Sequence, residues 1–395
     1  MHADSIVQRF IRTQLWEMHA SRQEPLAQSV CALMGGHKLS LTRLARATMG
    51  SKTMKSALKR VDRQIGSPQV LRESSLAAAA ISGQLCANNA MRELVVAVDW
   101  SAVAPGGEFA ELRAVVTNAG MGRGIVLYQE VYPRAQQGSH NAERDLLRRL
   151  KSGIPATVKV IIVSDAGFRQ PWFEQVQSLG WNWIGRVRGN AQVRQYAGAW
   201  RGLTRWMKSA RFRAHRHSDC ELTREHRLCC ELVVVKARAT GRKIYARAGH
   251  GVNSTAARYA RAGAQEPWVL AHSKELSERF RAQEIVALYA QRMQIEENFR
   301  DTKSTYFGMG LEMARSRSAL RLQGLLLIHT LAMFFLWHIG QLAEAEGLQR
   351  RFRSTTRTRR EISIIALALL LCAQRNIPLS PYAQLCLASR LGIRS

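Results

Sequence analysis

Three acidic residues have the types and positions that a metal-dependent reaction could use. Asp99 and Asp165 each end an apolar run, in LVVAVDWS and VKVIIVSD, and Glu296 lies in a segment with helical periodicity. Burying an acid is costly unless it pairs or binds a cation, and α/β sheets place their sites at strand carboxyl ends. An Asp can also end a strand merely as a turn or helix cap. Together, three carboxylates without His or Cys suit Mg²⁺ or Mn²⁺, and two such ions catalyse attack at phosphorus.

The acid Glu296 belongs to a predicted long helix, residues 282–304. At ~100° per residue, one narrow face carries this acid, three cations and a phenol: Tyr289, Arg292, Glu296, Arg300 and Lys303. An adjacent stripe of Leu288, Ile295 and Phe299 can pack on a sheet, whereas Glu297 and Asp301 point elsewhere. A carboxylate among cations stays ionised, and the cations suit phosphates. The alternative is a surface helix with internal ion pairs.

The overall charge of the chain favours a polyanionic partner. The 395 residues carry a formal net charge of +29, although the hydrophobic and charged fractions, 46% and 22%, are ordinary for a globular protein. DNA, RNA and acidic membranes are the available polyanions. Simple solubility is the alternative, but moderate charge would suffice for it. The same field argues against a glycosidase, which could also use a carboxylate pair.

Cysteine usage and the N-terminus indicate the compartment. Seven cysteines at irregular spacing argue against a disulfide framework and for a reducing cytosol. The start, MHADSIVQRF, lacks the apolar stretch of a signal peptide. We therefore expect a cytoplasmic, nucleoid-associated protein.

Residues 1–90 read as short helices that form a DNA-binding domain. A helix over 51–65 places its cations on one side and its apolar residues on the other. The cations are Lys52, Lys55, Lys59 and Arg63, and the apolar residues are Met54, Ala57, Leu58, Val61 and Ile65. A short helix, LSLTRLARA, precedes it across a turn, as in a helix-turn-helix. A solvated basic face is the alternative.

The fold class expected from the remaining elements is α/β, with a catalytic core over 91–310. Strands and helices follow in the order β-β-β-α-β-α-β, which would make the Asp99 and Asp165 strands neighbours in a ribonuclease-H-like sheet. A β-rich insertion is expected at 189–275, containing CCELVVVKA and KIYARA, and a helical region at 311–395. The apolar segment 325–339 is too short for a membrane span and is interpreted as a buried core helix.

A cluster of His and Cys residues lies within the insertion. It contains zinc-ligand types at His215, His217, Cys220, His226, Cys229 and Cys230. Their spacing matches no standard finger, so a zinc site stays an open alternative to ordinary strand residues.

The segment YAQRMQIEENFRDTK, residues 289–303, resembles the Y-(2)-R-(3)-E-(6)-K signature of insertion-sequence-four-type transposases. VDWS, IVSDAGF, GWNWIGRVRG and EPWVLA are similar to the same family, so the resemblance runs along most of the chain. It implies a ribonuclease-H-like core, a DDE triad of Asp99, Asp165 and Glu296, and two Mg²⁺ or Mn²⁺ ions. It also implies phosphate contacts from Tyr289, Arg292 and Lys303, and stacking of Trp268 on a flipped base, for which buried strand core is the alternative.

The expected function is therefore cut-and-paste transposition on double-stranded DNA. The resemblance implies strand cleavage, a hairpin intermediate and joining of the 3′ ends to target DNA by a homodimer, without a membrane or small-molecule partner. Arg300 is expected to join the DNA contacts. The alternatives are a non-catalytic DNA-binding regulator derived from a transposase and a related nuclease without strand transfer.

Overall fold

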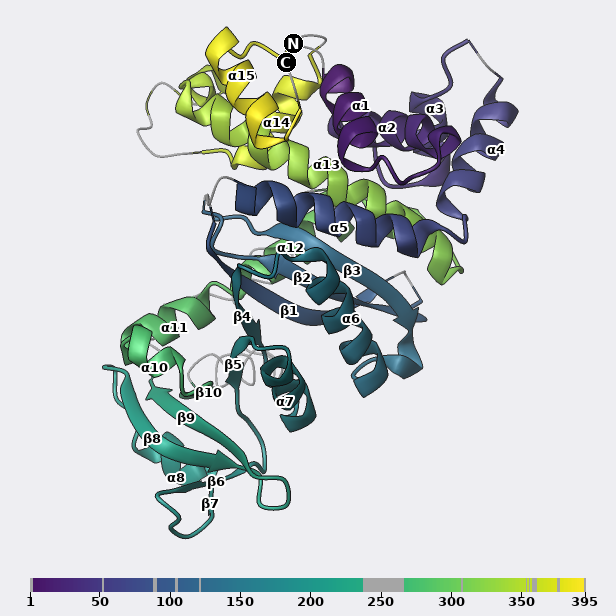
Figure 1. Cartoon of the computed structure of the whole chain (residues 1–395). Helices are drawn as coiled ribbons and strands as arrows, with labels where there is room; N and C mark the ends of the chain where they lie inside the picture. The colour runs from purple at the N-terminus through teal and green to yellow at the C-terminus, as the bar shows by residue number, and fades with distance from the viewer. Residues whose placement is uncertain are drawn as a thin grey trace, which may run out of the picture. The chain divides into compact units, whose positions relative to one another are not determined.

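A computed structural model of the chain divides into two compact units (Figure 1). The first unit comprises Met1–Lys159 and Met293–Ser395, and the second comprises Val160–Arg292. The structure describes residues 3–51, 53–87, 91–103, 106–120, 122–236, 266–306, 308–352, 354, 356, 361–374 and 377–393. The predicted KIYARA strand lies outside the described residues.

The first unit is built on an antiparallel meander of three strands. These are β1 (Glu93–Val103), β2 (Phe109–Val116) and β3 (Ile125–Pro133), in the order β3-β2-β1. The register places Asp99 opposite Arg113 and Ser101 opposite Glu111. Every residue of β2 from Ala110 onward is buried, so this central strand is covered on both faces. The three predicted strands are thus confirmed, each within two residues of its expected start.

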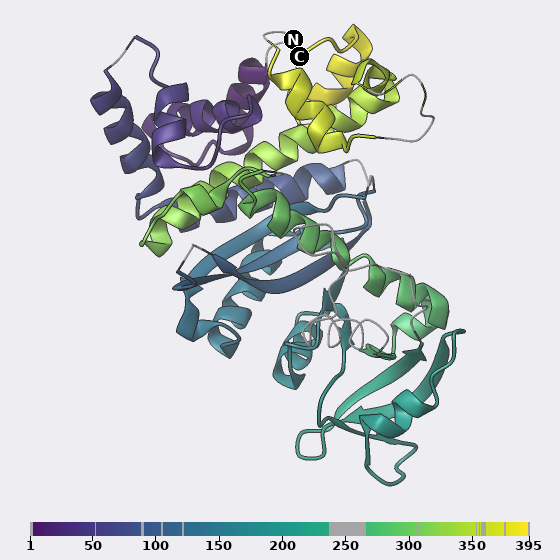
Figure 2. The same cartoon turned by 180° about the vertical axis from the view of Figure 1, so that it is seen from behind.

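The rest of the first unit is largely helical. Its helices are α1 (Ala3–Gln14), α2 (Ala20–Met34), α3 (Leu41–Ala47), α4 (Met54–Ile65), α5 (Val70–Cys86), α6 (His140–Gly153), α12 (Met293–Lys303), α13 (Ala319–Ala345), α14 (Ile364–Cys372) and α15 (Pro381–Arg390). Helix α6 packs on β2 and β3 (Figure 1), whereas α12 packs on β1 and α13 on β3 (Figure 2). The described parts of the N-terminal and C-terminal regions contain α1–α5 and α13–α15.

Helix α13 is the central core element of the first unit. It contacts β3, α2, α4, α5 and α14, and it is buried almost without interruption from Leu322 to Gly340. By length and composition it could cross a membrane, but 83% of its most apolar window is buried inside the protein. Gly324 lies against the backbone of Ile65, and Gly340 lies against that of Ile364, where a Cβ would clash. Because these contacts fill its surface, α13 is the buried core helix that the sequence predicts.

The predicted helix-turn-helix pair corresponds to α3 and α4. Ser40 caps α3 and Thr53 caps α4, each through its side-chain oxygen. The two helices pack on each other and on α2. The inward face of α4 contains Ala57, Val61 and Ile65, as expected, whereas Met54 and Leu58 are only partly buried.

The second unit contains one mixed sheet. Its strands are β4 (Lys159–Ser164), β5 (Asn182–Arg186), β6 (Gln192–Gln195), β7 (Arg201–Gly202), β8 (His215–Leu222), β9 (Leu228–Val235) and β10 (Trp268–His272). They follow the order β4-β5-β10-β9-β8-β6-β7, with β4 and β5 parallel and the other pairs antiparallel. The connecting helices are α7 (Gln170–Ser178), α8 (Leu203–Lys208), α10 (Leu276–Arg279) and α11 (Ala282–Ala290). The β-rich segment expected as an inserted lobe thus extends the sheet of β4 and β5.

The predicted single helix over 282–304 is wrong, because the structure divides it into α11 and α12. Gln291 and Arg292 form a turn between the two helices. Neither residue is a helix breaker, so the sequence carries no local sign of the interruption. Helix α11 packs on β5, β8 and β9 in the second unit, whereas α12 packs on β1 in the first. Tertiary packing in two different units therefore overrides the helical propensity of the segment.

The two compact units divide the chain differently from the three predicted domains. The N-terminal helices, the β1–β3 meander and the C-terminal helices all belong to the first unit. Helix α13 connects them, because it packs against all three regions. The predicted boundaries at residues 90 and 310 remain a prediction.

Candidate active site

The first predicted acid, Asp99, lies on β1 in the first unit. The expectation that it ends its strand is wrong, because β1 continues to Val103 as part of a hairpin with β2. The apolar run ends at Val98, but backbone pairing with β2 carries the strand further. One Asp99 carboxylate oxygen accepts a hydrogen bond from the Trp100 amide at 2.8 Å. By strand alternation, Ala97, Asp99 and Ser101 share one face of β1.

The acid Glu296 lies on α12 in the same unit. Its neighbours Ile295 and Phe299 are buried in a cluster with Ala97, Val115 and Val126. This cluster seats α12 on the face of β1 that carries Asp99. Glu296 itself is exposed, and it stands in the first turn of α12, where the helix dipole favours an acid. The first unit therefore supplies two of the three predicted carboxylates from packed elements.

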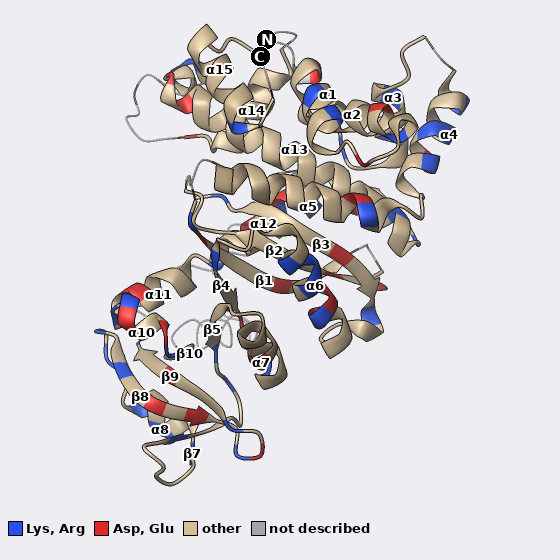
Figure 3. Ribbon diagram, in the orientation of Figure 1, with Lys and Arg blue, Asp and Glu red and all other residues tan. Residues whose placement is uncertain are grey.

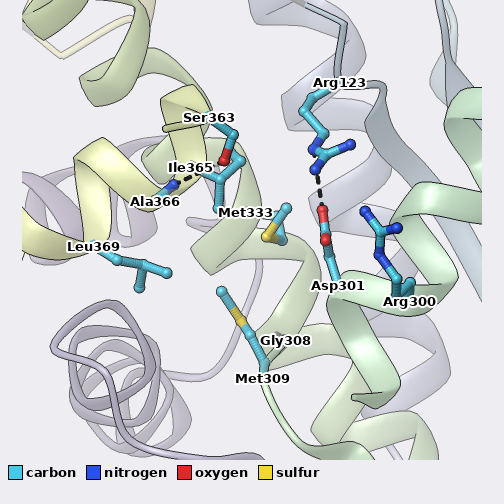
Figure 4. A pocket seen from close by; sticks show the side chains of 10 residues that line it. All are labelled: Arg123, Arg300, Asp301, Gly308, Met309, Met333, Ser363, Ile365, Ala366 and Leu369. Carbon is cyan, nitrogen blue, oxygen red and sulfur yellow. Dashed lines mark hydrogen bonds and ion pairs between the residues drawn. The ribbon is translucent and has the colours of Figure 1, made fainter. Parts of the chain in front are cut away.

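The other two acids of α12 have structural partners. The Arg123 guanidinium pairs with Glu297 at 2.9 Å and with Asp301 at 3.3 Å. Burial raises the pKa of Asp301, and Arg123 opposes this shift. Arg123 and Asp301 also line a cavity of about 400 Å³ with Arg300 and a set of apolar side chains (Figure 4). Both acids that the helical pattern set apart from Glu296 therefore pair with one arginine, Arg123.

Lys303, a predicted phosphate contact, lies in a buried network of the first unit. Its ammonium donates to the Ser101 hydroxyl and lies 3.7 Å from Glu111. Glu111 also pairs with Arg113 at 2.9 Å, and both side chains are fully buried. Burial lowers the pKa of Lys303, and Glu111 opposes that shift. In this structure Lys303 ties α12 to the β1–β2 hairpin.

This network contains charged residues that the sequence prediction did not assign. Arg113 donates to the Thr302 hydroxyl at 2.9 Å and lies over the Phe299 ring. His329 of α13 is fully buried, and its imidazole lies 3.1 Å from that hydroxyl. The sequence did contain a signal for this ion pair. Glu111 and Arg113 have opposite charges and lie two residues apart on a strand, so their side chains point to the same face.

The second predicted acid, Asp165, belongs to the second unit. It follows β4 directly, so its expected position at the end of a buried strand is confirmed. Its Oδ1 accepts a hydrogen bond from the Gly167 amide at 2.7 Å. A Cβ on Gly167 would approach the same carboxylate at 3.0 Å, so the turn leaves little room beside it. The predicted triad is thus divided between the units, with Asp99 and Glu296 in one and Asp165 in the other.

A cluster of cations and aromatic rings lies in the same unit as Asp165. The rings of Trp268 and Tyr289 meet edge to face at 5.0 Å, and the Arg186 guanidinium lies 6.0 Å from the Trp268 ring. Arg292 lies 5.9 Å from the Tyr289 ring. Glu266 pairs with Arg186 at 3.0 Å. We call these five residues the aromatic-arginine cluster.

The position of Tyr289 differs from the prediction. The helical pattern placed its phenol on an exposed face, but the residue is only 3% exposed, because it packs against Trp268. Burial raises the pKa of Tyr289, Arg292 and Arg186 oppose the shift, and the negative charge of Asp165 adds to it. Tyr289 is therefore electrostatically coupled to Asp165. Trp268 is partly exposed, in contrast to the buried residues that follow it in β10.

The basic face of α4 is present as predicted. Lys55, Lys59 and Arg63 are all exposed (Figure 3). Lys52 lies outside the described residues. Arg60, on a neighbouring face, donates instead to the carbonyl oxygen of Thr48 and so ties α4 to α3. The cations that the prediction assigned to DNA are thus distinct from the one that holds the helix pair together.

The described residues contain no preformed group of three His, Cys, Asp or Glu side chains that could hold a metal ion. Within the predicted zinc cluster, Cys220 and Cys230 are a buried cross-strand pair of β8 and β9, whereas Cys229 is exposed. His215 and His217 contact each other edge to face at 4.8 Å. Five residues of the cluster are thus strand residues of β8 and β9, whereas His226 lies in the turn between them.

No curated protein matches the chain. A family model described as the transposase DDE domain matches residues 95–335, which is more than half of the chain. The match begins at β1, runs through both units and ends within α13, so it includes Asp99, Asp165 and Glu296. The chain belongs to the transposase DDE domain family.

Proposed function

We propose that the protein is a cut-and-paste DNA transposase of the insertion-sequence-four type. It binds the two ends of its transposon, cleaves them by metal-assisted phosphoryl transfer and joins the freed 3′ ends to target DNA. The observation that carries this proposal is the signature itself. Its Tyr289 interacts electrostatically with Asp165 and contacts Arg292 in one unit, whereas its Glu296 lies on the helix that packs against the Asp99 strand in the other.

The proposed catalytic residues are Asp99, Asp165 and Glu296. Their donor set is entirely carboxylate oxygen, which suits Mg²⁺ or Mn²⁺. Two such ions, when bound, would neutralise charge on the attacking and leaving oxygens at phosphorus. Asp165 and Glu296 lie only a few residues from the two chain connections between the units, at Lys159–Val160 and Arg292–Met293. This proximity in the chain favours an active arrangement in which Asp165 joins the other two acids.

The aromatic-arginine cluster is proposed to hold the DNA around the scissile phosphate. Guanidinium groups such as Arg292 and Arg186 bind phosphate oxygens through paired N–H donors. Trp268 is partly exposed and offers a ring face for a displaced base. Tyr289 is proposed to hold the Trp268 ring in position, because the buried Tyr289 ring packs edge to face against it.

The proposed reaction sequence follows from the family resemblance. Water attacks one strand at each end, a new P–O bond forms as the P–O3′ bond breaks, and a 3′-hydroxyl is released. That hydroxyl attacks the opposite strand to form a hairpin, which water then opens. The free 3′-hydroxyl finally attacks a phosphate of the target. Bringing two ends together requires a homodimer in the DNA complex.

An in vitro reaction with full-length protein tests this proposal. The substrate is DNA carrying the terminal inverted repeats that flank the gene, incubated with Mg²⁺ and a supercoiled target plasmid, with EDTA in a parallel reaction. Joined product and a hairpin species that depend on Mg²⁺ are expected. Cleavage without joining would favour the nuclease, and binding without cleavage would favour the regulator.

A further inference from the structure

A second set of exposed cations lies in the second unit, on residues other than the aromatic-arginine cluster. Within one run of the chain, 201–213, five cationic side chains are exposed: Arg201, Arg205, Lys208, Arg211 and Arg213. The same run contains no Asp or Glu. We call this set the lobe cations. Figure 3 shows basic residues on α8, which lies within this run.

The acids that lie nearest in the sequence are engaged by other cations. Glu221 pairs with Arg194, and Glu231 pairs with Arg216 at 3.5 Å. Asp219 pairs with Lys274 at 3.1 Å. In the part of the chain that the structure describes, none of the lobe cations has an acidic partner within ion-pair distance. Five positive charges therefore remain uncompensated on one short segment.

The segment that carries the lobe cations is fixed by packing. Leu203, at the start of α8, is 2% exposed, and α8 contacts β7 and β10. The Arg211 carbonyl accepts a hydrogen bond from the Lys236 amide at 2.8 Å, which ties the end of the segment to the residue after β9. A fixed backbone lowers the entropy that ordering these side chains on a ligand would cost.

The aromatic residues in and next to this segment favour binding of duplex DNA over binding of a single strand. Trp200 lies under the Arg194 guanidinium at 5.1 Å, and Trp206 meets the His217 ring at 4.8 Å. Both tryptophans are only partly exposed. Phe212 is 57% exposed, but Lys236 lies 5.5 Å from its ring. Single-strand binding needs a row of open ring faces, whereas duplex binding needs cations spaced along the phosphate backbone.

We infer that the lobe cations bind the sugar-phosphate backbone of duplex DNA, as a contact separate from α4 and from the aromatic-arginine cluster. This inference rests on the proposed function and extends it. The surface adds affinity without reading sequence, because exposed Arg and Lys on phosphates carry no base information.

Two triple variants of the full-length protein test the inference. The lobe variant is Arg205→Gln, Lys208→Gln and Arg211→Gln. The matched control removes the same charge from exposed positions of α6: Arg144→Gln, Arg148→Gln and Lys151→Gln. Affinity for a terminal-repeat duplex is measured by fluorescence anisotropy across a salt series in Ca²⁺ or EDTA, where no cleavage can occur.

The lobe variant is expected to lose about tenfold or more in affinity near 150 mM salt, and its salt slope is expected to fall by up to about 3. The α6 control is expected to stay within about twofold of the unaltered protein. Equal losses in the two variants, or a loss confined to single-stranded DNA, would overturn the inference. If the unaltered protein binds no DNA at all, the proposed function fails instead. Circular dichroism verifies that both variants are folded.

Discussion

A buried charged network in the first unit and the cations of the second unit are arranged in different ways. In the first unit, Glu111 and Arg113 are fully buried and Lys303 is largely buried. Glu111 forms ion pairs with both cations. In the second unit, Arg186 and Arg188 both pair with Glu266, whose side chain is partly exposed. The lobe cations are exposed to solvent. The first arrangement fixes a structure, and the second leaves positive charge available for a polyanion.

This difference divides the roles within the transposase signature. Glu296 and Lys303 lie on α12 in the unit with buried charge pairs, where Lys303 ties the helix to β1 and β2. Tyr289 is in the last turn of α11 and Arg292 lies in the turn that follows, both in the second unit. Under the proposed function, the signature joins the helix that positions Glu296 to a phosphate-binding element in the unit that carries Asp165. The following changes test that division, in order of expected effect.

The largest effect on stability is expected from Glu111→Gln. The substitution leaves Arg113 buried without its countercharge, and such a loss costs about 3–5 kcal/mol. Urea denaturation of the full chain measures it. Asp62→Asn is the control, because its partner Arg321 is 47% exposed and such a pair contributes about 1 kcal/mol at most. Equal losses in the two variants would show that the buried network does not hold the first unit together.

Acid is expected to destabilise the first unit through its buried histidines. Burial lowers the pKa of His338 to about 3 and lowers that of His329 well below its usual range. The unfolded chain therefore binds more protons below about pH 6.5, and stability falls as pH drops toward the folded value. At pH 5 the loss is about 2 kcal/mol for His338. His338→Leu should flatten the fall in unfolding free energy between pH 7 and pH 5, and an unchanged profile would contradict this assignment.

Glu266→Gln, in the second unit, is expected to change stability only slightly and to raise the affinity for DNA. The acid is half-exposed, so unfolding free energy should change by about 1 kcal/mol or less. Removing it releases Arg186 and Arg188 for phosphate, so duplex affinity should rise roughly fivefold, which corresponds to about 1 kcal/mol. Anisotropy titration measures the gain. Glu284→Gln serves as the control, since it releases only the exposed Arg281 on α11; a gain of equal size there would remove the special role of the cluster.

Much of the fold could be predicted because its signals are local. Apolar runs bounded by polar turns gave β1 through β5 within a few residues, and the amphipathic pattern of 51–65 gave α4. The buried nature of α13 followed from its composition and its two histidines. The break between α11 and α12 could not be predicted, because Gln291 and Arg292 are good helix formers and packing on separate units determines the interruption.

The candidate site was only partly predictable for the same reason. The helical pattern placed Glu297 and Asp301 on another side of the helix from Glu296, and in the structure both of these acids pair with Arg123. It placed Tyr289 and Lys303 on an exposed face, but tertiary contacts bury the first against Trp268 and the second against Glu111. Pair contacts between distant strands and helices, such as Arg186 with Glu266, leave no periodic trace in the sequence.

The central claim is that Asp165, carried by the second unit, acts with Asp99 and Glu296 of the first. Its most direct test compares Asp165→Asn with Glu174→Gln, an exposed acid on α7 of the same unit, in the Mg²⁺-dependent cleavage and binding assays on terminal-repeat DNA. Asp165→Asn is predicted to lower cleavage by about 10³-fold or more while leaving DNA affinity within a few-fold, because it removes a carboxylate needed for phosphoryl transfer. Glu174→Gln is predicted to retain cleavage. Cleavage by Asp165→Asn at a rate near that of the unaltered protein would contradict the account.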